Sequence, residues 1–121
     1  MKTSELIGPA LDWAVEVAEG RTPTYRSDMC AFMVARSHER ATSVYEYSTD
    51  WAQGGPIIER ECITWSMVMN PEGSDETRWL AFSYRHGSSK AVAGPSQLIA
   101  AMRCFVASKL GDEVEIPEEL K

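Results

Sequence analysis

A short polar, glycine-rich segment holds the side chains best suited to binding chemistry. Asp50 and Gln53 supply polar tips, and Trp51 supplies a flat stacking face with one N–H donor. Two glycines then allow close backbone approach, and a proline favours the first turn of a helix, whose free N–H groups attract anions. We expect a loop ending at Pro56, with these candidate ligand- or partner-binding residues: Thr49, Asp50, Trp51, Gln53, Gly54 and Gly55.

A purely structural interpretation of this segment stays open. In it, Asp50 or Thr49 caps a turn, Trp51 fills the core and the glycines only turn the chain. A phosphate-binding loop would also carry a lysine followed by serine or threonine, and the segment has no such lysine. The segment by itself therefore identifies no ligand.

The reactive side chains elsewhere match no catalytic or metal-binding motif. His38 and His86 lie in polar segments, where solvated histidines are expected. Cys30, Cys62 and Cys104 are odd in number and lack Cys-x-x-Cys spacing, which is typical of buried thiols, although a cysteine nucleophile paired with a histidine stays an alternative. We therefore predict no metal ion and no cofactor, identify no catalytic residue, and favour a non-enzymatic protein.

The net charge of −6 is concentrated at one end of the chain. Residues 112–121 hold five of the 18 acidic residues, which leaves 13 acidic against 11 basic residues in the rest. A nearly neutral body without a basic stripe argues against direct binding of nucleic acid. No apolar run has the length of a membrane span and no secretory signal is recognisable, so we expect a cytoplasmic protein without a membrane partner.

Two helices are predicted from apolar periodicity. The first follows Gly8-Pro9 and ends at Gly20, with a stripe at Leu11, Ala14, Val15 and Ala18. The second opens at residues 94–96 and is closed by a glycine cap. Its wide stripe comprises Leu98, Ile99, Met102, Phe105, Val106 and Leu110.

Four strands are predicted between the helices. One hairpin is expected to join residues 29–34 and 44–48, and a second to join residues 63–69 and 78–85. Between the hairpins, residues 49–61 are expected to hold a loop with one helical turn. A loose loop is expected at 86–93. The predicted class is α+β, a single layer of antiparallel sheet with the N-terminal and C-terminal helices packed on one face.

A single domain is expected over residues 1–111, followed by an acidic tail at 112–121. Val114, Ile116 and Leu120 recur through that tail, and the first two alternate with glutamates as in a short edge strand. We therefore expect the tail to dock on the body or on a partner.

Several runs resemble a known family: residues 2–6, 10–15, 48–61, 98–104 and 106–114 are similar to the NinX-like proteins of temperate phages and prophages. The resemblance covers about half of the chain, and residues 50–56 are its most distinctive stretch. Blocks 21–47 and 62–93 lie outside it, and we expect them to carry partner specificity. The resemblance implies a small phage-encoded accessory protein in the host cell, and it carries no established activity.

Two functions are compatible with these observations. The first is a non-enzymatic interaction protein that binds a host or phage protein, for host takeover or for blocking a defence. The second is a small-ligand or nucleotide-binding protein, with or without hydrolysis, whose site is the segment from Thr49 to Pro56. Homo-oligomerisation is left open by the sequence.

Overall fold

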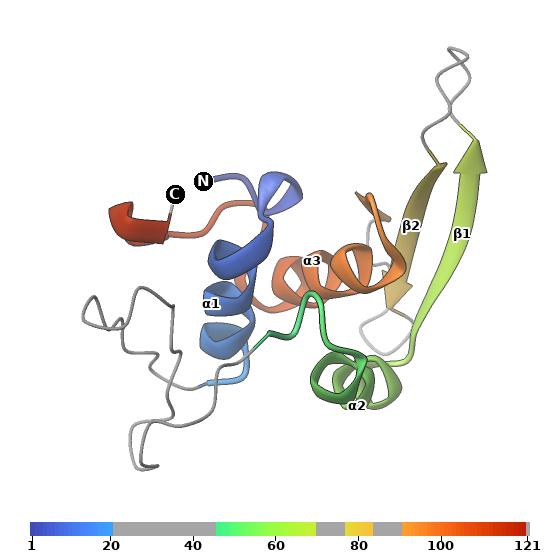
Figure 1. Cartoon of the computed structure of the whole chain (residues 1–121), viewed down its shortest axis with the longest axis horizontal. Helices are drawn as coiled ribbons and strands as arrows, with labels where there is room; N and C mark the ends of the chain where they lie inside the picture. The colour runs from blue at the N-terminus through green and yellow to red at the C-terminus, as the bar shows by residue number, and fades with distance from the viewer. Residues whose placement is uncertain (21–45, 70–76, 84–90, 121) are drawn as a thin grey trace.

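The computed structural model describes residues 1–20, 46–69, 77–83 and 91–120 (Figure 1). No helix in those ranges has the length and apolar character needed to cross a membrane. The expected strand at 29–34, its turn, and the turn at 70–73 lie outside the described residues. The elements in chain order are η1 (Thr3–Glu5), α1 (Gly8–Ala18), α2 (Trp51–Glu61), β1 (Ile63–Met69), β2 (Thr77–Ser83), β3 (Val92–Gly94), α3 (Gln97–Leu110) and η3 (Glu118–Leu120).

The sheet is antiparallel, with strand order β1-β2-β3. Ile63 lies opposite Ser83 and Met69 opposite Thr77, which confirms the second predicted hairpin. The described part of the chain thus has three strands where about four were expected. The third strand, β3, lies where the sequence predicted the end of a loose loop. It forms a strand because its backbone pairs with Trp79 to Ala81 of β2, a contact that its own short sequence does not predict.

Helix α3 is the central packing element. Its predicted caps are present, since the Ser96 side chain accepts the Ile99 N–H at 3.1 Å and Gly111 ends the helix with a positive φ of 88°. Burial extends beyond the predicted stripe to Ala100, Ala101, Arg103 and Cys104. The reason is visible in Figure 1, where α3 lies between α1 and the sheet and is therefore covered on more than one side.

Helix α1 packs on α3 through its predicted stripe, with Leu11, Ala14 and Val15 at most 1% exposed. The α+β class is confirmed. Helix α3 is the element that covers the sheet, and α1 lies on its other side (Figure 1).

The expected strand at 44–48 is wrong for its described residues, because 46–49 form a turn. The N–H groups of Thr49 and Asp50 both donate to the Glu46 carbonyl, at 3.1 and 2.8 Å. This local bonding takes the place of a strand ladder and leads the chain into α2.

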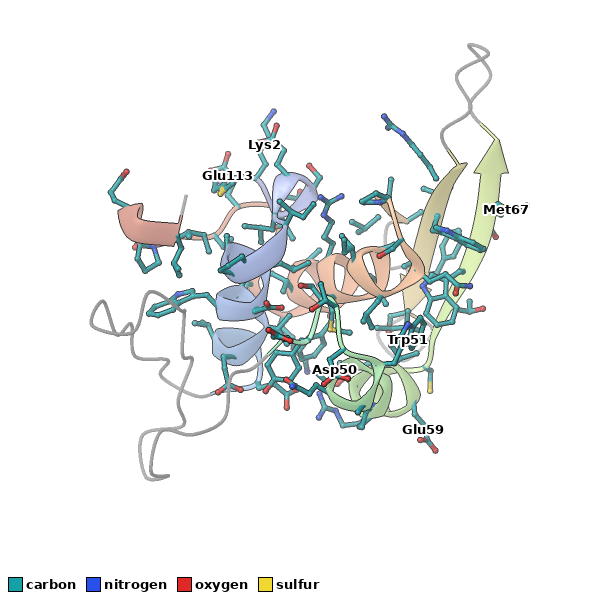
Figure 2. The ribbon with its side chains drawn as sticks, in the orientation of Figure 1. Lys2, Asp50, Trp51, Glu59, Met67 and Glu113 are labelled. Atoms are coloured by element: carbon teal, nitrogen blue, oxygen red, sulfur yellow. The ribbon has the colours of Figure 1, made fainter. Side chains whose placement is uncertain are left out.

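The segment after α3 returns along the N-terminus. The Thr3 N–H donates to the Asp112 carbonyl at 2.8 Å. Lys2 forms an antiparallel bridge with Glu113, and Figure 2 shows the side chains of these two residues near each other. Ile116 and Leu120 are 6% and 7% exposed and join the core. The tail therefore docks on the body, as expected, and its contact is with the N-terminal segment.

Candidate functional site

The segment expected to be a loop forms the start of helix α2. Asp50 is the N-cap, with extended backbone at φ −113°, and its Oδ1 accepts the Ala52 N–H at 2.9 Å. The helix begins at Trp51 and continues through Gly54, Gly55 and Pro56 to Glu61. The predicted helix start at Pro56 is wrong, because a side-chain cap upstream already satisfies a free N–H of the first turn.

The polar tips of the candidate site hold the turn onto the helix. Gln53 Nε2 donates to Asp50 Oδ2 at 3.1 Å, and Gln53 Oε1 accepts the Glu46 N–H at 2.7 Å. Thr49 is exposed within that turn. The capping interpretation of Asp50 is therefore confirmed, and we infer that Asp50 and Gln53 position their neighbours.

Trp51 is half exposed, at 50%, so its interpretation as a core residue is wrong. Its ring meets that of Trp65 edge to face, with centroids 6.0 Å apart and planes at 65°. Trp65 is itself fixed, because its Nε1 donates to the Gln97 carbonyl at 2.8 Å. Trp51 thus presents a rigidly supported aromatic face between α2 and β1 (Figure 2).

An open groove of about 450 Å³ lies beside Trp51, and we call it the tryptophan groove. Ser48, Thr49 and Trp51 line one part of it, and Trp79 with residues 95–99 at the start of α3 lines the rest. Of the six candidate residues, the fold brings only Thr49 and Trp51 into this lining. Trp79 was not among the candidates, since only the pairing of β2 with β3 places it near α3.

The two candidate glycines have different surroundings. A Cβ on Gly54 would lie 2.6 Å from Leu98 Cδ1 and 2.6 Å from the Tyr47 carbonyl oxygen. Outside the neighbouring residues, a Cβ on Gly55 would meet no atom within 4 Å. Gly54 is therefore the residue that lets α2 approach α3, and it serves packing.

Two buried carboxylates of α1 anchor the turn before α2. The Ser48 N–H donates to Asp12 Oδ1 at 2.9 Å, and the Tyr47 hydroxyl donates to Glu16 Oε1 at 2.7 Å. Burial raises the pKa of Asp12 from 3.8 to about 6, partly offset by hydrogen bonds from Ser48, with a smaller increase from Glu46. The sequence reasoning missed this pair, although two carboxylates four residues apart beside the apolar stripe were a usable signal.

Asp12 should make stability depend on pH between about pH 4 and pH 6. Because its folded pKa is raised, the stabilisation it contributes is complete below its ordinary value of 3.8 and is lost as the pH rises through about 6. Denaturation of the wild type and of Asp12→Asn across this range should show the wild type losing about 3 kcal/mol relative to the variant. Parallel curves for the two proteins would contradict a buried, titrating Asp12.

The cysteines do not form a reactive centre in the described residues. Burial raises the pKa of Cys104 to about 11, which disfavours a thiolate nucleophile. Cys62 is exposed, so its prediction as a buried thiol is wrong, and it ends α2 in the left-handed region at φ 54°. Cys30, His38 and His86 lie outside the described residues. Within 1–20, 46–69, 77–83 and 91–120, no three His, Cys, Asp or Glu side chains gather as a metal site.

Comparison with known proteins places the chain in a family. The search of curated proteins found no match. The family described as "Bacteriophage P22, NinX" matches residues 2–109, and the match runs through the blocks 21–47 and 62–93 that the sequence resemblance left out. It also includes every residue that lines the tryptophan groove. The chain therefore belongs to the phage NinX family.

Proposed function

We propose that this phage protein is a non-enzymatic interaction protein that binds a host or phage protein through the tryptophan groove, as a host-takeover or defence-blocking factor in the host cytoplasm. The observation that carries the proposal is the half-exposed Trp51 at the edge of the groove. Tryptophan is enriched among the few residues that supply most of the affinity in protein interfaces.

The fixed position of Trp51 supports this role. Asp50 caps the helix that carries it, Trp65 packs against its ring, and Asp12 holds the preceding turn. An anchor that is already ordered loses little conformational entropy when a partner binds. The groove beside it offers room for one inserted side chain of the partner.

Binding of a small planar ligand is the second candidate. The groove volume of about 450 Å³ lies in the range of ligand pockets, and Trp51 and Trp79 both line it. Its openness favours a protein partner, because small ligands are usually enclosed on most sides. A nucleotide that shifts the thermal midpoint of the wild type, and not of Trp51→Ala, would favour this second candidate.

Site-specific photo-crosslinking in phage-infected cells tests the proposed function. A photoreactive residue at position 49, which is exposed and lines the groove beside the intact Trp51, should capture a defined host or phage protein, whereas the same residue at Ile7, which is 54% exposed and lies outside the groove, should not. Trp51→Ala should then weaken binding of that purified partner by roughly tenfold or more, with Ile7→Ala unchanged. Equal capture at both positions would contradict the proposal.

A further inference from the structure

The outer edge of β1 is an unpaired sheet edge. Strand β2 pairs with one side of β1, and no segment among the described residues pairs with the other. Figure 1 shows β1 as the outermost element of the sheet. Within the described ranges, the backbone groups that point outward from Ile63–Met69 therefore have no strand partner.

This edge also lacks the features that normally protect one. Sheet edges are usually guarded by charged residues, proline, bulges or short length. Strand β1 has seven residues, pairs with β2 without interruption, and contains neither a charged residue nor a proline. Met67 on this strand is 59% exposed, the highest value among the exposed large hydrophobic residues of the described chain. Such an edge is expected to be covered by a strand.

We propose that the outer edge of β1 pairs in antiparallel fashion with β1 of a second copy, around a two-fold axis at Ser66. This register pairs the strand over its whole length, from Ile63 to Met69. Trp65 then lies opposite the partner's Met67, and Ser66 lies opposite the partner's Ser66. The two sheets become one, with both α3 helices on the same face.

The outer edge of β1 is complementary to itself, which favours a second copy of this chain as its partner. The two-fold axis forms the Trp65–Met67 contact twice, and a methionine sulfur at an aromatic ring is a favourable contact. It covers the exposed Met67 side chain in both copies. Each copy carries a net charge of −6, yet the edge is uncharged, so strand pairing brings no like charges together. The inference is independent of the proposed partner in the tryptophan groove.

Charge pairs at position 66 test the proposal on the full-length protein by sedimentation velocity. The wild type should be a dimer at micromolar concentration. Ser66→Lys and Ser66→Glu each place like charges opposite each other and should each weaken dimerisation roughly fivefold or more. Their equimolar mixture should recover the dimer, because opposite charges then meet across the axis. The side chain of Ser66 is exposed, so both variants should fold.

The same substitutions at Ser4 are the matched control, because Ser4 is exposed in η1, away from β1 (Figure 1). Ser4→Lys and Ser4→Glu should leave the dimer unchanged. A monomeric wild type, an oligomer indifferent to charge at position 66, or a mixture that fails to recover would each overturn the proposal.

Discussion

Replacing Phe105 with alanine should lower the free energy of unfolding by about 3–5 kcal/mol. The ring is 1% exposed at the centre of α3, and the Arg60 guanidinium carbon of α2 lies 5.5 Å above it. Truncation removes buried apolar surface and leaves a cavity between elements that cannot fully collapse. Chemical denaturation of both proteins measures the difference.

Leu110→Ala is the control within the same helix. Leu110 belongs to the same apolar stripe predicted from the sequence, but it is 36% exposed near the helix end. Its truncation should cost clearly less than that of Phe105, because about a third of its surface already contacts water and its removal leaves no closed cavity. Equal losses for the two variants would show that α3 is not buried as the structure places it.

Gly54→Ala should destabilise the protein by about 1–3 kcal/mol, as overpacking does. The added Cβ would lie 2.6 Å from Leu98 Cδ1, which can rotate, and 2.6 Å from the Tyr47 carbonyl oxygen, which belongs to the backbone. Relief therefore requires α2 to move away from the turn at 46–49, because the Tyr47 carbonyl cannot rotate away. The thermal midpoint should fall accordingly.

Gly55→Ala is the matched substitution with a smaller expected effect. Outside the neighbouring residues its Cβ meets no atom within 4 Å, and the residue lies inside α2 without a positive φ. Alanine is favoured over glycine in a helix interior, but a Cβ directly before Pro56 disfavours helical backbone, so this variant should change stability by less than about 1 kcal/mol. If Gly55→Ala lowers the midpoint as much as Gly54→Ala does, the close approach at Gly54 is absent.

Elements defined by local signals were predictable from the sequence. Helix α3 has a serine cap, a long apolar stripe and a closing glycine, and it forms almost where expected. Strand β1 matches its predicted bounds because residues 63–69 are rich in β-branched and aromatic residues. In both elements the signals that start, pattern or end the element lie within the segment itself.

Helix α2 was not predictable on the same basis. Two glycines and a proline inside it indicate a loop by propensity, yet the chain stays helical through them. The Asp50 cap starts the helix, and the close approach of Gly54 to Leu98 makes glycine the residue that fits there. Tertiary packing thus outweighed the local preference.

The sequence by itself determined the α+β class, the two long helices, the second hairpin, the family resemblance and the neighbourhood of the candidate site. Only the tertiary structure decided that Trp51 faces solvent, that Trp79 joins it along a groove, and that Asp12 anchors the turn 36 residues away. The physical reason is the distance along the chain over which each interaction acts. Capping and periodicity act over a few residues and can be seen in the sequence, whereas burial and long-range hydrogen bonds depend on which distant segments the fold brings together.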